Sequence, residues 1–255
     1  MSKNDIARLF LDVETCPNIV LSWRAGYNIT ITPDNILEER RIICASWKWQ
    51  GEKKVHNASW DKDQCDKKVL EKVIQAINKA DEIVYQNGDR FDLPWIKTRA
   101  LFHGIPMLPT YKTFDTLKKI KSNFYFNSNR LDYVQKFLGG QGKLDTGGYK
   151  LWTDVHMKDD RKALKKMVSY CDQDVVELEH LFRKILPYVP HNTHVGALLG
   201  EPKYTCPNCG SADVCHHQKR VTAAGTIKHG MKCKTCSSHY TISNADYNRL
   251  IKDRG

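Results

Sequence analysis

Two acidic side chains interrupt an apolar run near the start of the sequence, Leu9-Phe10-Leu11-Asp12-Val13-Glu14-Thr15. The run has the composition of a buried strand, and successive side chains of a strand point to opposite faces. Asp12 and Glu14 are two residues apart, so they share one face and can reach a common ion. Because buried anions lose hydration and repel one another, they need a metal or a basic partner.

Two further acidic motifs lie far along the chain, Asn87-Gly88-Asp89-Arg90-Phe91-Asp92 and Tyr170-Cys171-Asp172-Gln173-Asp174. Asp92 precedes a helical pattern and could simply cap it. Tyr170 and Asp174 are four residues apart in the longest helical pattern, hence on one helix face, whereas Asp172 lies off that face. Oxygen ligands in such a cluster suit Mg²⁺ or Mn²⁺. Two such ions can drive the cleavage of a phosphodiester bond.

The hydrophobic pattern predicts an α/β fold in which helices flank a mixed β-sheet. We expect strands at residues 8–13, 42–49, 54–60, 83–86 and 111–114, and helices at residues 66–79, 93–102, 131–138 and 161–186. Residues 23–41 are polar and rich in turn formers, which indicates an exposed excursion. Its aromatic residues Trp23 and Tyr27 could stack on an unpaired base, but we expect them to pack down on the domain.

The composition favours a polyanionic partner. The 255 residues include 40 Lys or Arg and 29 Asp or Glu, a formal net charge of +11. A solvated basic surface would explain the charge equally well, but an acidic site that handles phosphates needs a basic surround. No apolar stretch approaches the ~18 residues of a membrane span, and the N-terminus has no signal-peptide pattern. We therefore expect a cytoplasmic protein without a membrane partner, in the host cytoplasm if the protein is viral.

The cysteines predict a second kind of site. Five of the nine lie in the last 55 residues, and four of these form two C-x-x-C pairs, Cys206/Cys209 and Cys233/Cys236. Four thiolates in this pairing predict one tetrahedral structural Zn²⁺. The segment resembles a zinc ribbon with a hairpin turn at Ala224-Gly225. One alternative remains open, in which another residue displaces a cysteine or a second ion binds, at Cys215, His216, His217, His229 or His239.

The zinc-ribbon segment could contact nucleic acid or a protein. Residues 201–255 include nine Lys or Arg and four Asp or Glu. Basic residues cluster around the C-x-x-C pairs, so we favour nucleic acid over protein docking, although four thiolates and one Zn²⁺ together subtract charge.

At the three acidic motifs the chain resembles the DEDDy branch of the DEDD exonucleases, which have a ribonuclease H-like fold. The similarity to the proofreading domains of family B DNA polymerases covers roughly residues 6–190. It implies an exonuclease domain at residues 1–190, a linker at 191–202 and a zinc-ribbon domain at 203–255. No segment is long enough for the palm and fingers domains of a polymerase, so the resemblance implies a stand-alone nuclease.

The resemblance also implies roles for the motif residues. Asp12 would bridge two Mg²⁺ or Mn²⁺ ions, Glu14 and Asp174 would complete the site of the water-activating ion, and Asp92 would hold the second ion. Tyr170 would orient the attacking water, since its ordinary pKa of about 10 makes it a poor base at neutral pH.

Four residues are candidates for substrate binding. Asn87 would support the site or contact the terminal nucleotide, and Arg130 lies in a segment that resembles a substrate-proximal part of the same relatives. Lys121 and Phe124 belong to a stretch that mixes cations with aromatic rings, which is typical of single-strand contacts.

Together these features predict a metal-dependent 3′–5′ exonuclease that removes nucleotides from DNA 3′ ends, single-stranded ends included. It would serve DNA repair, replication or recombination, and a phage or another virus is one of the sources that fit. An exoribonuclease and a structure-selective endonuclease remain open on the same fold. From another class, the alternative is a catalytically idle nucleic-acid-binding or recruiting factor, against which the intact carboxylates and Tyr170 argue.

Overall fold

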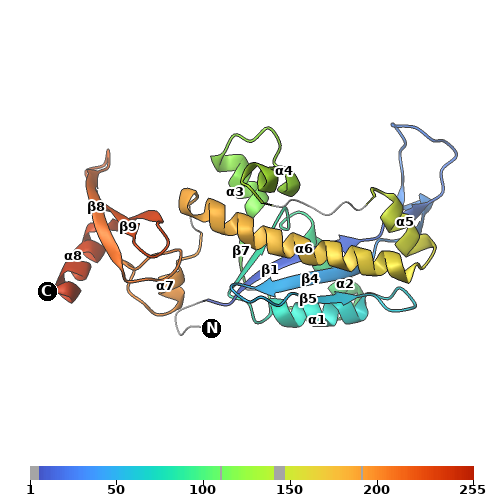
Figure 1. Cartoon of the computed structure of the whole chain (residues 1–255), viewed down its shortest axis with the longest axis horizontal. Coiled ribbons are helices and arrows are strands. Elements are labelled where there is room, and N and C mark those ends of the chain that lie inside the picture. The colour runs from blue at the N-terminus through green and yellow to red at the C-terminus, as the bar shows by residue number, and fades with distance from the viewer. Residues whose placement is uncertain (1–5, 110, 141–146, 191) are drawn as a thin grey trace.

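In the computed structural model of the protein, which describes residues 6–109, 111–140, 147–190 and 192–255, a mixed sheet forms the centre of the larger part (Figure 1). The first five residues of the expected exonuclease domain and the first residue of the expected linker lie outside these ranges. The sheet has the order β5-β4-β1-β6-β7. Its strands are β1 (Arg8–Thr15), β4 (Ile42–Trp49), β5 (His56–Ser59), β6 (Glu82–Tyr85) and β7 (Lys112–Asp115).

The predicted mixed sheet is confirmed. β1 pairs antiparallel with β4 and parallel with β6, while β4–β5 is antiparallel and β6–β7 is parallel. All five expected strands and the four expected helices are present in the expected order. These helices are α1 (Lys67–Ile77), α2 (Asp92–His103), α4 (Leu131–Phe137) and α6 (Arg161–Ile185).

The alternation of side chains along β1 divides the interior between two hydrophobic cores. Leu9, Leu11 and Val13 belong to one core, together with α1, α2, α5 and the N-terminal half of α6. Phe10 belongs to the other, together with α4 and the C-terminal half of α6. In Figure 1, α6 and α1 lie on opposite sides of the sheet. Asp12 and Glu14 share the face of Phe10, so both acids point towards the α6 side.

Several helices were not predicted. They are α3 (Thr116–Asn123), α5 (Lys150–Met157), α7 (Val195–Leu198) and α8 (Asn244–Arg254). Helix α3 follows β7 without a loop, because the carboxylate of Asp115 accepts hydrogen bonds from the N–H groups of Leu117 and Lys118. Such N-terminal caps stabilise a short helix, and α3 has only eight residues.

The expected excursion is a long loop on a short antiparallel ribbon, formed by β2 (Ile19–Val20) and β3 (Ile36–Glu38). The expectation that its aromatic side chains pack on the domain is wrong. Relative to an extended reference, Trp23 is 103% exposed and Tyr27 is 107% exposed.

The cysteine-rich segment forms a three-stranded sheet of its own, with the order β10-β9-β8. The strands are β8 (Val214–Val221), β9 (Ile227–Cys233) and β10 (His239–Ser243). The turn expected at Ala224-Gly225 is present, with Gly225 at a φ of +79° that favours glycine. Within the expected linker, the N–H of Val195 in α7 donates to the carbonyl of Pro207 over 2.8 Å. This helix therefore packs on the cysteine-rich segment. No helix in the described part of the chain is both long and apolar enough to cross a membrane.

A fully buried carboxylate, Asp66, joins three elements of the larger part. It accepts hydrogen bonds from Arg99 at 2.7 and 2.9 Å and from the N–H of Ile42 at 3.0 Å, and it lies 2.7 Å from Nε2 of His103. Burial by itself would raise the pKa of Asp66, but the hydrogen bonds from Arg99, Ile42 and His103 outweigh burial, and the pKa lies below its usual value.

Replacing Asp66 with Ala should destabilise the protein by about 3–5 kcal/mol, because it leaves the Arg99 guanidinium buried without its anion. The folded pKa of Asp66 lies below its unfolded value of about 3.9, so its contribution is full above that pH and is lost as the pH falls through the folded pKa. Urea unfolding of both proteins between pH 7 and pH 3 measures this. Arg161→Ala, which removes the partially exposed ion pair with Asp159, is the control and should cost at most about 1 kcal/mol. Equal midpoints for Asp66→Ala and wild type at pH 7 would contradict the assignment.

Candidate active site

The packing of α6 against β1 brings the first and third acidic motifs together. The rings of Phe10 and Phe182 meet edge to face with centroids 5.5 Å apart. From Phe182 back to Asp174 the helix rises about 12 Å, at 1.5 Å per residue. From Phe10 forward, Asp12 and Glu14 lie about 7 and 13 Å along the strand. The two elements run in opposite directions, so Asp174 comes to lie beside the two acids of β1.

The resulting acidic group consists of Asp12, Glu14 and Asp174, each of which offers one carboxylate oxygen within 4.8 Å of the others. Asp174 is buried, whereas Asp12 and Glu14 are half-buried. Carboxylates held this close repel one another in the absence of a cation. The donor set consists of oxygen atoms, which suit Mg²⁺ and Mn²⁺ rather than soft metals. The residues present therefore fit the divalent metal that the sequence predicts.

Asp92 lies beside this group but not within it. It is the first residue of α2, it is 3% exposed, and its Oδ1 accepts a hydrogen bond of 3.0 Å from the N–H of Val13. Burial and the charge of Asp12 raise the pKa of Asp92 well above its usual value. The carboxylate is thus anchored to the strand of Asp12 and is sensitive to charge there. Its predicted role as a ligand of a second ion stays a prediction.

Tyr170 is half-buried on α6, one turn before Asp174. The ring of Trp152, on α5, lies edge-on to it with centroids 6.5 Å apart. The sequence did not point to Trp152, because the surrounding residues carry no motif. The contact limits where the tyrosine ring can move. Its role in orienting water stays a prediction.

Two residues of the third motif support the acids rather than join them. The thiol of Cys171 lies 3.2 Å from Oδ2 of Asp12, and burial, a hydrogen bond with Cys44 and the charge of Asp12 raise its pKa well above its usual value. Asp172 accepts a hydrogen bond of 2.6 Å from Ser46 and one of 2.8 Å from Asn57. It therefore fastens α6 to β4 and β5, and it lies outside the acidic group, as its position on the helix predicts.

The candidate substrate residues lie on several segments. The N–H of Asn87, which has a φ of +67°, donates to Asp115 over 3.0 Å. Lys121 on α3 and Arg130 at the start of α4 are exposed. Phe124 is half-buried, and its ring packs against that of Phe126 with centroids 5.6 Å apart. Their predicted contacts with substrate stay predictions.

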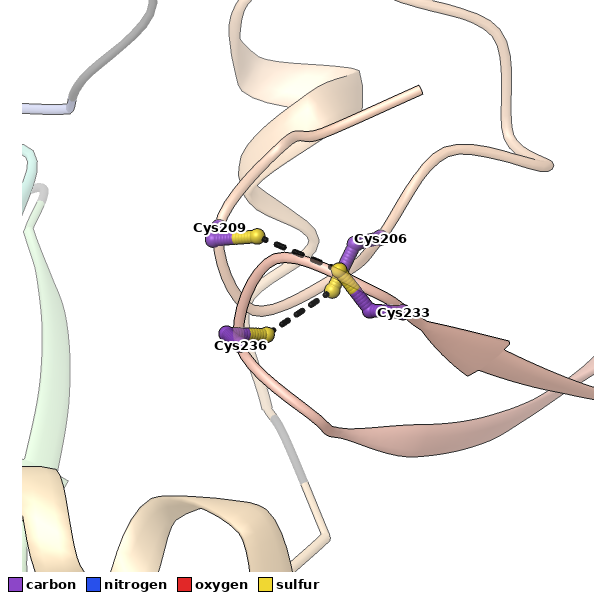
Figure 2. Close-up of side chains that lie close together, drawn as sticks. All are labelled: Cys206, Cys209, Cys233 and Cys236. Carbon is purple, nitrogen blue, oxygen red and sulfur yellow. Dashed lines mark hydrogen bonds between the residues drawn. The ribbon is translucent and has the colours of Figure 1, made fainter. Parts of the chain in front are cut away.

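The four cysteines of the C-x-x-C pairs converge at one end of the ribbon sheet (Figure 2). The sulfur atoms of Cys206 and Cys236, and those of Cys209 and Cys233, are each 3.6 Å apart. A disulfide would place them about 2.05 Å apart, whereas a tetrahedral Zn²⁺ with Zn–S bonds of about 2.3 Å would place them about 3.8 Å apart. The cluster is consistent with a zinc ribbon.

The alternative zinc ligands lie apart from the four cysteines, since the group of close ligand atoms found among the described residues includes none of them. Nδ1 of His229 lies 3.2 Å from Nε2 of His216, and its Nε2 lies 2.9 Å from Oδ1 of Asn244. Its ring stacks on Tyr247 with centroids 3.8 Å apart. This histidine network packs α8 on the ribbon sheet. The other alternative ligands, Cys215, His217 and His239, are half-buried or exposed.

A third group of close ligand atoms consists of Cys65, Asp66 and His103, but its contacts are not those of a metal site. Both oxygens of Asp66 accept hydrogen bonds from Arg99. The guanidinium therefore already supplies the compensating positive charge, which makes this a structural ion pair.

Comparison with known families identifies the superfamily of the larger part of the chain. The sequence profile of the RNase_H superfamily matches residues 38–186. This is more than half of the 255 residues, so the chain belongs to the RNase_H superfamily. Comparison with curated protein sequences gave no match.

Among solved structures, the family B DNA polymerase from the hyperthermophilic archaeon Pyrobaculum calidifontis is similar, with a TM-score of 0.53 and 17% sequence identity. The match covers 72% of this chain and 25% of the polymerase, so the chain spans about a quarter of that protein's length. At this identity the likeness shows the fold alone. It confirms the ribonuclease H-like fold that the acidic motifs predict.

Replacing Cys233 with Ser should abolish zinc binding and unfold the ribbon, because about 50 residues bury too little apolar surface to fold without metal. Zinc released on denaturation, measured with a colorimetric chelator, should fall from one equivalent to well below it, and limited proteolysis should trim residues 203–255 first. Cys215→Ser, which changes a thiol outside the group, should keep both properties of the wild type. A Cys233→Ser protein that retains one equivalent of zinc would refute the four-cysteine site.

Proposed function

We propose that the protein is a metal-dependent 3′–5′ exonuclease that hydrolyses phosphodiester bonds at DNA ends with two divalent ions. One observation carries the proposal: Asp12 and Glu14 on β1 and Asp174 on α6 bring carboxylate oxygens within 4.8 Å of one another. Carboxylate oxygens brought together from residues 162 positions apart, Asp12 and Asp174, are the kind of ligand group that Mg²⁺ and Mn²⁺ prefer. The RNase_H superfamily membership supports a nuclease of this kind.

The proposed division of labour follows from the position of each side chain. Asp12, Glu14 and Asp174 would hold the ions, and a divalent ion bound there would lower the pKa of a water molecule and offset charge on the phosphate. Asp92, anchored on the Val13 N–H, would complete the second ion's site. Tyr170, one helical turn from Asp174, would form a hydrogen bond with the attacking water through its phenolic hydroxyl and fix the direction of attack.

The direction of cleavage and the choice of DNA rest on the sequence motifs and on the fold. The three motifs resemble those of proofreading exonucleases, and one similar solved structure is that of a DNA polymerase. A net charge of +11 supports a nucleic-acid substrate in general. Cleavage of 3′- and 5′-labelled DNA and RNA, with and without Mg²⁺, separates this proposal from a ribonuclease and from an endonuclease.

The C-terminal segment, residues 203–255, would be a zinc ribbon that adds phosphate contacts. Its hairpin exposes three basic side chains, Lys219, Arg220 and Lys232. Cations on an exposed hairpin can reach a nucleic-acid backbone that the nuclease domain holds by its end. We therefore favour nucleic acid over a protein as the partner of this segment.

Replacing Asp12 or Asp174 with Ala should reduce Mg²⁺-dependent cleavage below detection while the fold stays intact, because each change removes a ligand without opening the hydrophobic core. Loss of one like charge from the group should leave the metal-free protein as stable as the wild type or more so. Release of a labelled 3′ nucleotide and the urea midpoint test both points. Glu71→Ala, at an exposed carboxylate on α1, is the control and should cleave normally. Wild-type turnover in Asp12→Ala would refute the proposed site.

Replacing Tyr170 with Phe keeps the ring against Trp152 and removes only the hydroxyl. We expect the rate of cleavage to fall by about 10²–10⁴-fold, the range that a displaced proton-transfer group gives. Mn²⁺ affinity, measured by electron paramagnetic resonance titration, should stay within error of the wild type. If Mn²⁺ affinity falls as far as it does in Asp174→Ala, Tyr170 is part of the metal site and the assigned role is wrong.

A further inference from the structure

The loop between β2 and β3 carries two aromatic side chains, Trp23 and Tyr27, that the rest of the described protein leaves exposed. Trp23 is 103% exposed and Tyr27 is 107% exposed. Exposing these two rings to water has a cost in free energy, because burial of apolar surface is worth about 25 cal/mol per Å². The residues between them are exposed as well. We call residues 22–31 the aromatic loop.

The base of the aromatic loop is well fixed. The N–H of Leu21 donates to the carbonyl of Asn35 over 2.9 Å. The N–H of Thr32 donates to the side chain of Asn35 over 2.9 Å, and the N–H of Asn35 donates back to the carbonyl of Thr32 over 3.0 Å. These contacts close the loop at its base, where it leaves the β2–β3 pair.

The aromatic loop is attached next to the candidate active site. Glu38, at the end of β3, lies 3.4 Å from His156 of α5, and Arg41 lies 3.2 Å from the same ring. Helix α5 also carries Trp152, whose ring meets that of Tyr170. On the other side, only residues 16–18 separate β1, with its two acids, from β2. Figure 1 shows the loop rising beyond α5, on the same side of α6 as α3 and α4.

The chemistry of the loop fits nucleobases. Residues 19–32 include one basic side chain, Arg24, and no Asp or Glu, so nothing in them repels a phosphate backbone. Indole and phenol rings stack on bases of any sequence, because every base has a π face. Bases inside a duplex offer no free face, whereas those of a single strand or a frayed end do.

We propose that the aromatic loop binds unpaired bases of the nucleic-acid strand whose end lies at the acidic group, through Trp23 and Tyr27. The inference rests on the proposed function and extends it: the preferred substrate is a strand with unpaired bases near its end, either single-stranded or frayed. An apolar surface of a protein partner is the competing occupant. Binding of the loop variants to single-stranded and duplex DNA distinguishes the two.

The experiment measures binding without cleavage, so that it does not depend on the proposed activity. The full-length protein, with no Mg²⁺ or Mn²⁺ added, is titrated into a single-stranded DNA oligonucleotide that contains 2-aminopurine and into a blunt duplex of the same sequence. The variants are Trp23→Ala/Tyr27→Ala and Trp23→Phe/Tyr27→Phe. Phe102→Ala, at a ring that is 71% exposed on α2, is the matched control.

We expect the double alanine variant to bind the single strand about tenfold or more weakly, since 1.4 kcal/mol corresponds to a factor of ten. Its affinity for the blunt duplex should change less than twofold, and the quenching of 2-aminopurine should disappear. The double phenylalanine variant should recover most of both signals, and Phe102→Ala should equal the wild type. Unchanged single-strand affinity in the double alanine variant would overturn the inference and leave a protein partner as the occupant. An equal loss on single strand and duplex would overturn it too.

The cleavage assay of the Asp12→Ala variant keeps the two proposals apart. If Asp12→Ala cleaves normally while the double alanine variant loses single-strand binding, the exonuclease site is wrong and the aromatic loop is a binding element. If Asp12→Ala is inactive while single-strand binding survives in the double alanine variant, the site stands and the loop proposal fails.

Discussion

Mutual repulsion among carboxylates held in a partly dry site is the constraint on which the rest of this structure depends. Two buried aspartates show how differently the fold treats such groups. Asp66 has the guanidinium of Arg99 beside it, and its pKa lies below the usual value. Asp92 has Asp12 as a charged neighbour, and its pKa lies well above the usual value. The first carboxylate has its compensating cation, whereas a proton or a bound cation would relieve the repulsion at the second.

The fold keeps the repelling groups together by fastening α6 to the sheet at both sides of them. On the C-terminal side Phe182 packs on Phe10, and Lys48 of β4 pairs with Glu179. On the N-terminal side Asp172 is held by Ser46 and Asn57. The acids therefore cannot separate without breaking apolar and polar contacts at both ends. A site built on a strand and a long helix is positioned more precisely than one on loops, which is what ions with strict geometry require.

The elements that could be predicted from the sequence are those in which the local pattern and the tertiary role agree. β1 and α6 carry clear periods, and their acids stand out because they interrupt apolar faces. Helix α3 was missed because it is short, with eight residues, and because its start depends on a cap from Asp115. Trp152 was missed because a contact with Tyr170 leaves no trace in local sequence. The prediction for Trp23 and Tyr27 failed because it rested on the general tendency of aromatic rings in such loops to pack on the domain.

That failure is informative about how this chain combines fold and specificity. Every residue of the acidic group lies on a regular element that the hydrophobic cores hold rigid, whereas the exposed aromatic rings lie on a loop that leaves the sheet just after the acids. A loop can change without disturbing the register of β1 against α6, since its ends are closed by the β2–β3 ribbon. Related folds can therefore share one chemistry and differ in the nucleic acid they accept. In the role proposed for Trp23 and Tyr27, the two rings would select the strand that reaches the acidic group, and a change in the loop would leave the carboxylates in place.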